Sequence, residues 1–115
     1  MKKLILLTLL LLPLITFSQA ILGTDIDGEA ANDNSAWSVS MDNDGSHVAI
    51  GAIYNDGNGS NSGHVRIYSW DGSAWNQVGS DIDGEAAGDQ SGYSVSIDSD
   101  GSHAVSYTHL TLPTT

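Results

Sequence analysis

The chain has 115 residues, with 14 acidic side chains against 3 basic ones and a formal net charge of −11 at pH 7. Such a charge repels nucleic acid and anionic membrane surfaces, so neither is expected as a partner. There is no cysteine, which excludes disulfide bonds as a source of stability. The acidic side chains attract divalent cations, although they also serve simply to keep an exported protein soluble.

Residues 1–20 have the pattern of a bacterial Sec-type signal peptide. Two lysines form a positive start, residues 4–17 are almost entirely apolar, and Ser18 and Ala20 offer cleavage sites. The apolar run is shorter than the roughly 20 residues that a membrane-spanning helix needs. An uncleaved anchor is the rival interpretation, and the small residues after the run argue against it. The sequence therefore predicts a secreted or cell-surface protein with no membrane insertion after cleavage.

Two stretches of the chain are copies of one sequence. Residues 23–47 and 79–103 are offset by 56 positions and are identical at 18 of 25. A fixed period of this length is typical of repeat proteins, in which each unit buries its apolar face only against neighbouring units. The sequence predicts repeats over residues 21–104, with one unit at 23–78 and a partial second unit at 79–104. We therefore expect a fragment of a longer protein that contains further repeats.

Each unit reads as a set of short β-strands. In the first copy apolar residues alternate with serines, which is the period of a strand with one buried face, and the second copy repeats the pattern; these residues are Trp37, Val39 and Met41, and Tyr93, Val95 and Ile97. A second strand is predicted at 47–53. Its Val48, Ile50 and Ala52 share one face, and the small Ala49 and Gly51 on the other suit close packing against a neighbouring sheet.

The rest of the unit is predicted as a loop and a hairpin. Residues 54–63 are rich in glycine and asparagine, which is typical of a loop. Strands are predicted at 64–70 and 74–78 around the turn Asp71-Gly72. Residues 81–92 are predicted to form a loop because of their glycine and aspartate content. Four short strands per unit, joined by Asp-Gly turns, are typical of a β-propeller blade, so we expect an all-β fold of about one and a half four-stranded blades.

The second copy breaks off after His103. The first copy continues VAIGA, whereas the second continues AVSYTHLTLPTT. The nucleotide string GTC TCT TAT ACA CAT CTG ACG CTG CCG ACG, which resembles the adapter of a shotgun sequencing library, translates to the amino acids of residues 105–114. Two interpretations stand: residues 105–115 are a translated adapter, which we favour and exclude from the fold, or they are a genuine divergent C-terminus.

The strand segments SAWSVSMDNDGSHVAIGAI and SGYSVSIDSDGSH resemble the FG-GAP repeat of integrin-type propellers. The family pattern is Phe-Gly-x-Ser-Val, an acidic turn, a hydrophobic strand and Gly-Ala-Pro. The matching positions are Gly92, Ser94 and Val95 in the second copy, and Ser38, Val39, Gly51 and Ala52 in the first. The resemblance implies a seven-bladed extracellular propeller in the intact protein, often one that acts in adhesion or ligand binding. The text is also similar to repeats of large exported bacterial surface proteins.

The calcium loop that the family usually carries is incomplete in this sequence. The acidic turn reads Asp42-Asn43-Asp44-Gly45-Ser46, with His47 where a final aspartate would stand. Calcium takes six to eight oxygen ligands, and two carboxylates with one amide fall short. The turn is therefore predicted to use its aspartates for backbone reasons, as tight β-turns do.

A second acidic pattern, Asp-x-Asp-Gly-Glu, recurs at the crossing between units. It resembles part of an EF-hand loop but lacks the twelve-residue register and the flanking helices. Its repetition is explained either by architecture or by calcium, which is the one metal that the sequence suggests. The calcium candidates are Asp25, Asp27, Glu29 and Asp33, and Asp81, Asp83, Glu85 and Asp89. The loop with Asn55, Asp56, Asn58 and Asn61 is a further candidate for a cation or a sugar, or a solvated hairpin loop.

No motif predicts catalysis. The recurring His47 and His103 stand beside a turn without a nucleophile in a recognisable pattern, and no phosphate-binding glycine motif occurs. Trp70 and Trp75 offer either a sugar-stacking platform or a cross-strand pair, and their spacing across a hairpin favours the pair. We expect a non-catalytic structural, adhesive or ligand-binding module with a protein or glycan partner. The alternative is a non-catalytic part of a carbohydrate-processing enzyme.

Overall fold

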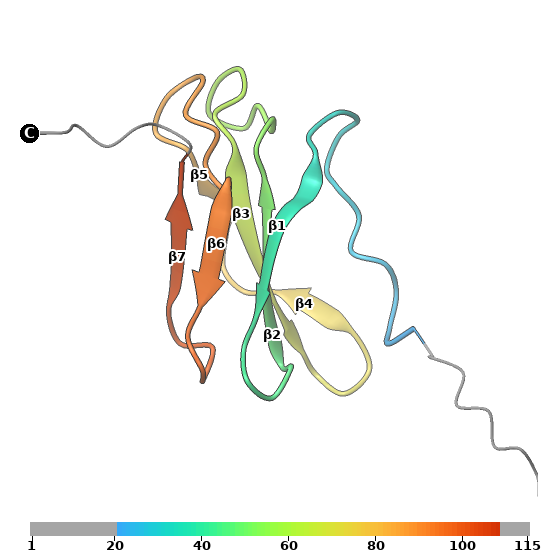
Figure 1. Ribbon diagram of the computed structural model, residues 1–115. Helices are drawn as coiled ribbons and strands as arrows, with labels where there is room; N and C mark the ends of the chain where they lie inside the picture. The colour runs from blue at the N-terminus through green and yellow to red at the C-terminus, as the bar shows by residue number, and fades with distance from the viewer. Residues whose placement is uncertain (1–20, 109–115) are drawn as a thin grey trace, which may run out of the picture.

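The computed structural model describes residues 21–108 (Figure 1). The predicted signal peptide and residues 109–115 of the predicted tail lie outside the described residues. The described part is all-β, as the sequence predicts, and its strands pair antiparallel. No helix capable of crossing a membrane occurs within residues 21–108.

The first unit is an antiparallel sheet whose strands follow chain order. Its four strands are β1 (Ser35–Met41), β2 (His47–Ala52), β3 (His64–Trp70) and β4 (Trp75–Gln77). All four predicted strands are present with ends within two residues of the prediction. The start of β1 is irregular, because its pairing with β2 shifts between Ser35 and Ser38 and Ala36 has a positive φ of 65°.

A fifth, very short strand was not expected. β5 (Ile82–Asp83) pairs antiparallel with the start of β3, in a segment that the sequence predicts as a loop, and that prediction is wrong at these two residues. β4 covers only the far end of β3, from Tyr68 to Trp70. The start of β3 therefore has no β4 partner on the side away from β2. β5 pairs with it there and satisfies its backbone hydrogen-bonding groups.

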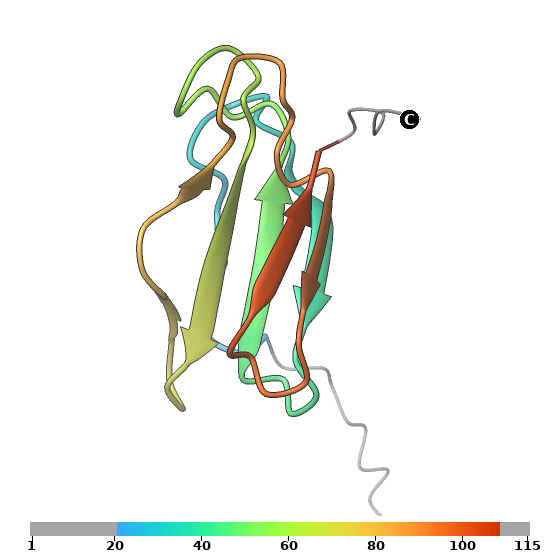
Figure 2. The same ribbon diagram turned by 90° about the vertical axis from the view of Figure 1, so that its left-hand side faces the viewer.

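The second unit contributes a hairpin that lies against the first. β6 (Ser94–Ile97) pairs with β7 (Ala104–Tyr107), and β6 contacts both β1 and β2. Figure 2 shows this hairpin beside the first sheet. We call the contact between the hairpin and β1 and β2 the seam. Residues 105–107 of the predicted tail form most of β7, and the adapter interpretation stays a prediction.

The two faces of β2 have different neighbours, as the sequence predicts. Val48 and Ile50 pack with Tyr68 in the buried cluster of the first sheet, with Ile26 and Trp75 at its margin. On the opposite face a Cβ atom at Gly51 would overlap the carbonyl oxygen of Gly92 in the second unit. The absence of a side chain at position 51 therefore lets the two units approach closely.

The two tryptophans form the cross-strand pair that their spacing predicts. Trp70 and Trp75 lie directly opposite each other on β3 and β4. Their ring centroids are 5.3 Å apart and the ring planes are tilted by 54°. This geometry is typical of aromatic packing. Each ring packs against the other, so the pair is part of the structure of the hairpin.

Candidate functional site

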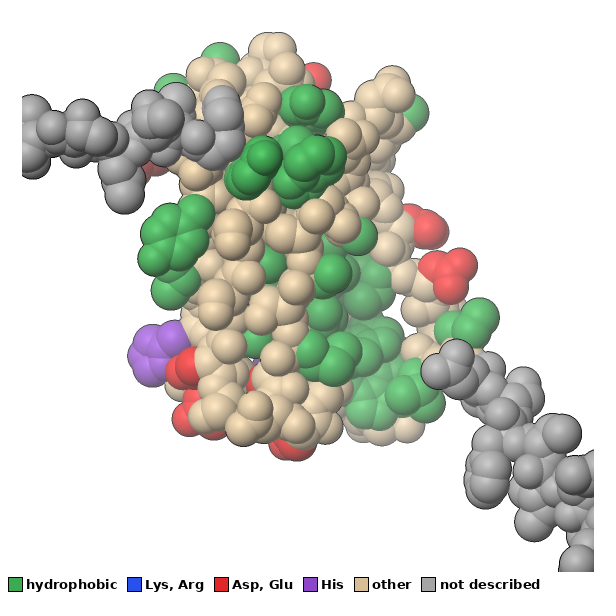
Figure 3. Space-filling view, in the orientation of Figure 1, with side chains coloured by type: hydrophobic (Ala, Val, Ile, Leu, Met, Phe, Trp, Pro, Cys, Tyr) green, Lys and Arg blue, Asp and Glu red, His purple; other side chains and the backbone are tan. Residues whose placement is uncertain are grey.

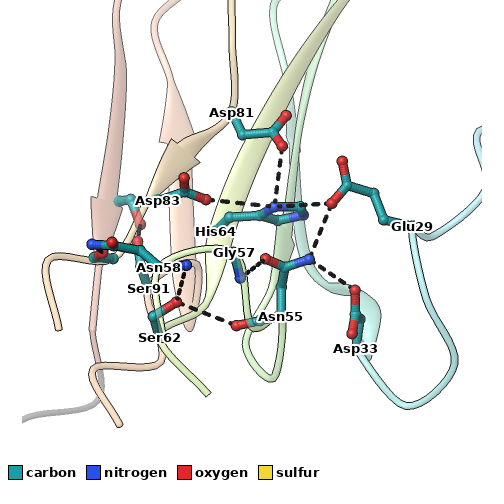
Figure 4. A network of polar contacts seen from close by, with 12 residues as sticks. Glu29, Asp33, Asn55, Gly57, Asn58, Ser62, His64, Asp81, Asp83 and Ser91 are labelled. Atoms are coloured by element: carbon teal, nitrogen blue, oxygen red, sulfur yellow. Dashed lines mark hydrogen bonds and ion pairs between the residues drawn. The ribbon is translucent and has the colours of Figure 1, made fainter. Parts of the chain in front are cut away.

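A buried histidine at the start of β3 is the centre of the most polar region of the structure. The side chain of His64 is 1% exposed, and its Nδ1 atom has no hydrogen-bond partner. Three carboxylate oxygens face this nitrogen: Glu29 Oε2 at 3.8 Å, Asp81 Oδ2 at 3.8 Å and Asp83 Oδ1 at 4.0 Å (Figure 4). Burial of a polar atom without a partner costs about 1–3 kcal/mol, so this arrangement calls for an explanation.

The pairing of β5 with β3 places the two aspartates. Asp83 lies directly opposite His64, and Asp81 is two residues earlier, so both side chains lie on the same side of the extended chain. Gly84 follows, and a Cβ atom there would overlap the carbonyl oxygen of Ser62. The Asp-x-Asp-Gly pattern thus has a structural basis, with two aspartates directed at the histidine and a glycine that permits close approach of the chains.

Glu29 is held in place by a buried asparagine. The amide of Asn55 donates to Glu29 Oε2 at 3.1 Å and to Asp33 Oδ2 at 2.8 Å. Its Oδ1 accepts from the backbone N–H of Gly57 at 2.8 Å. Asn55 and Asp33 are both buried. They form a support behind Glu29, which is itself partly open to solvent.

Chemically the site combines one imidazole nitrogen with several carboxylate oxygens. The nearest ligand atoms of Glu29, His64 and Asp81 all lie within 4.8 Å of one another. Within the described residues, His64 is the only ion-pair partner of these carboxylates and of Asp83. Three carboxylates thus surround a single imidazole, and the region can attract a cation.

The structure brings together only some of the acidic candidates. Glu29 and Asp81 come together at His64, Asp83 faces the same nitrogen, and Asp33 supports Glu29 through Asn55. The remaining candidates lie outside this cluster; they are Asp25, Asp27, Glu85 and Asp89. The backbone carbonyl of Asp27 accepts a hydrogen bond from the Arg66 guanidinium at 2.7 Å. The carboxylate of Asp89 accepts one from the Ala86 N–H at 2.9 Å.

Sequence reasoning missed His64 as a member of the cluster. Its position as the first residue of a strand carries no metal signature, and its partners lie 35 residues before it and 17 and 19 residues after it. The polar loop before β3 also has more structure than its composition suggests. Asn58 donates to the carbonyls of Gly84 and Glu85 at 2.8 and 3.1 Å. This loop therefore links the first unit to the start of the second.

The acidic turn after β1 does not fit calcium. Asp42, whose side chain is 1% exposed, accepts from the His47 backbone N–H at 3.1 Å and from Ser46 Oγ at 3.0 Å, and lies 2.7 Å from His47 Nδ1. Asp44 accepts from the Ser46 N–H at 2.9 Å. The carboxylates are thus already used by the turn, as the sequence predicts. Burial raises the pKa of the Asp42 carboxyl, but these hydrogen bonds outweigh it and lower that pKa to about 2.

The same turn has the residue types of a catalytic triad without its geometry. Ser46 Oγ and Asp42 Oδ2 both contact the same nitrogen of His47, at 2.9 and 2.7 Å. A serine nucleophile needs the base to use one ring nitrogen for the serine and the other for the aspartate. The second copy repeats the arrangement with Asp98 and His103. Hydrogen bonds led by the one from the His103 backbone lower the pKa of Asp98 as well.

Comparison with known families agrees with the fold. Residues 20–68 match the family model of the FG-GAP repeat, and this segment is an FG-GAP-like repeat, as the resemblance predicts. The antiparallel all-β structure is consistent with a partial FG-GAP propeller. No curated protein and no solved structure matches the chain.

Proposed function

We propose that this chain is a non-catalytic module of an exported or cell-surface protein, built to stack against further copies of its own repeat unit. FG-GAP repeats are generally structural modules and are typical of extracellular or surface proteins. The signal-peptide pattern at the N-terminus supports export. Within this frame the module has a structural or adhesive role, and the adhesive partner is a protein or a glycan.

A comparison of equivalent residues carries the proposal. Ile97 of the second unit is the counterpart of Met41 in the first, 56 positions earlier. Ile97 is 9% exposed where its strand lies on the first unit, whereas Met41 is 54% exposed. Val39 and Val95 differ in the same direction, since Val39 is exposed and Val95 is half-buried. The apolar side chains that the first unit covers in the second unit are therefore exposed at the equivalent positions of the first unit.

Figure 3 shows hydrophobic side chains gathered along β1 on this face. We call Val39 and Met41 the open strip. Adjacent exposed apolar side chains of this kind mark an interaction surface. A preceding unit that used its own β2 face would cover the open strip in the way that the first unit covers Ile97.

Directional contacts make the stacking specific. Ser38 Oγ donates to the Gly92 carbonyl at 2.6 Å, and the Ile97 N–H donates to Ser40 Oγ at 3.1 Å. Each hydrogen bond joins residues of different units, and their polar groups match only in one register. Apolar contact supplies the driving force for stacking, and these bonds fix how the units align.

Sedimentation of the exported chain over a range of concentrations tests the proposal. We expect concentration-dependent association, and we expect a Val39→Lys, Met41→Lys double variant to sediment as a monomer because two charges cannot be buried in the strip. Val78→Lys is the matched control, since Val78 is also exposed, at 47%, but lies off the strip. Association that persists in the double variant, or a wild-type chain that stays monomeric throughout, would refute stacking through this face.

A further inference from the structure

We propose that His64, Glu29 and Asp81 form a binding site for a divalent transition metal, with Zn²⁺ as the preferred ion and Asp83 beside the site. Two independent observations point to a ligand. The carboxylate oxygens of Glu29 and Asp81 lie within 4.8 Å of each other and of His64 Nδ1, and that buried nitrogen has no hydrogen-bond partner. The inference goes beyond the stacking function, because it concerns a site within this chain.

The distances from His64 Nδ1 to the carboxylate oxygens suit atoms that bind one ion together better than atoms that bond directly to each other. The separations of 3.8, 3.8 and 4.0 Å between Nδ1 and the carboxylate oxygens exceed the length of a hydrogen bond. Ligands of tetrahedral zinc at bond lengths of 2.0–2.2 Å lie roughly 3.3–3.5 Å apart. The carboxylates must therefore move inward by about half an ångström. The carboxylate side chains are 31–42% exposed, which leaves them room for a shift of this size, while the ring is fixed by burial.

The donor set selects the class of metal. Calcium and magnesium prefer oxygen ligands alone, whereas an imidazole nitrogen favours zinc and its first-row neighbours. The Asp-x-Asp-Gly-Glu pattern suggests calcium because it contains only carboxylate ligands. The addition of His64 to the cluster moves the preference toward zinc.

A second layer of contacts supports the acidic ligand on the first unit. Asn55 donates to Glu29 and to the buried Asp33, which fixes the orientation of the Glu29 carboxylate. Supporting hydrogen bonds of this kind are typical of metal ligands, and their loss costs about 10-fold to 100-fold in metal affinity.

The ligands come from both repeat units. Asp81 and Asp83 are the second-unit counterparts of Asp25 and Asp27, and they join Glu29 and His64 of the first unit. Each copy of Asp-x-Asp-Gly-Glu thus has two tasks: its aspartates complete the site of the preceding unit, and its glutamate belongs to its own. A metal bound here connects consecutive units, so that metal binding and docking of the units stabilise each other.

Calorimetric titration of the chelator-treated exported chain with Zn²⁺ at physiological salt tests the site. We expect one saturable site per chain, with Ca²⁺ binding at least tenfold more weakly. Glu29→Gln and Asp81→Asn each remove one partly exposed ligand and should weaken Zn²⁺ binding at least tenfold. The matched controls Asp25→Asn and Glu85→Gln remove the same charge outside the cluster and should change affinity less than twofold.

A ring-specific measurement keeps the test independent of folding in the variants. Nitrogen-15 NMR of the histidine rings should show a coordination shift at His64 on addition of Zn²⁺, with His103 unchanged as an exposed reference. A shift at His103 in place of His64, or equal losses in the control and ligand variants, would show diffuse attraction by the acidic surface. Either result, or the absence of saturable binding, would overturn the proposal.

Discussion

Replacement of Gly51 by alanine tests the close approach of the two repeat units. An alanine Cβ would overlap the Gly92 carbonyl oxygen and would lie 2.9 Å from its carbonyl carbon. Carbon atoms pack at about 3.5–4.0 Å, so the second unit must withdraw by about 0.6–1.1 Å. Ser38 Oγ, at 2.7 Å, could rotate away, but the Gly92 carbonyl is backbone, and its overlap cannot be relieved by rotation of a side chain.

The magnitude follows from two terms. Overpacking of this kind costs about 1–3 kcal/mol, and withdrawal also breaks the 2.6 Å hydrogen bond from Ser38 to Gly92, which contributes about 0.5–1.5 kcal/mol. Docking of the second unit should therefore weaken by about 1.5–4.5 kcal/mol. In a strand without this contact the same change would be stabilising by about 0.5–1 kcal/mol, because glycine loses more entropy on folding. Destabilisation by Gly51→Ala would therefore show that the close contact exists, and stabilisation would show that it does not.

Amide hydrogen exchange measures the docking directly. The Ile97 N–H donates to Ser40 Oγ across the seam, so its exchange reports opening between the units. We expect it to accelerate about 10-fold to 2,000-fold in Gly51→Ala. The Asp42 N–H, bonded to the His47 carbonyl within the first unit, is the internal reference.

A Ser38→Ala variant separates the two terms. It removes the hydrogen bond without introducing a Cβ at position 51, and it should accelerate exchange at Ile97 by only about 2-fold to 12-fold. Unchanged or slower exchange at Ile97 in Gly51→Ala would refute the argument that glycine is required for the units to meet.

Three further predictions concern the turn, the support of Glu29 and the hairpin. Because the pKa of Asp42 falls from 3.8 to about 2 in the folded protein, its ionised form stabilises the fold above pH 4 and this stabilisation is lost as the pH falls toward 2; Asp42→Asn should flatten the acid limb of a pH-dependent unfolding curve, and an unaltered limb would contradict this. Asn55→Ala leaves the buried Asp33 carboxylate without its amide donor and should lower the free energy of unfolding by about 1–3 kcal/mol in urea titrations, whereas Asn76→Ala, at an exposed position of β4, should change it little. Trp75→Ala should cost about 3–5 kcal/mol, less where the exposed hairpin relaxes, and should abolish the far-ultraviolet exciton couplet of its pair with Trp70; survival of that couplet would show that the two rings are not coupled.

The strands could be predicted because their signals are local. Alternation of apolar residues and serines marks β1 and β6, and the small residues of one β2 face indicated the neighbouring sheet before its position was known. β5 could not be predicted, since a two-residue strand depends on the free edge that β3 offers to residues 17–19 positions later. The left-handed backbone of Ala36 is likewise set by the irregular pairing of β1.

The acidic cluster was predicted only in part for the same reason. The repeated carboxylates are visible in the sequence, but which of them join the ligand group and which four lie outside it depends on which strand passes beside them. His64 becomes a member only because β5 pairs with its strand. The predicted adapter tail stays a prediction, although Tyr107 occupies the repeat position of Gly51, where the seam of the first unit leaves no room for a side chain of that size.

The division of the cluster between consecutive units has a consequence for counting. An open row of units completes one fewer junction than it has members, because the first pair of aspartates and the last glutamate lack a counterpart. A closed ring completes every junction, since its last member meets its first. The ratio of bound metal to repeat units in a longer natural form would therefore distinguish an open row from a ring without any image of the molecule.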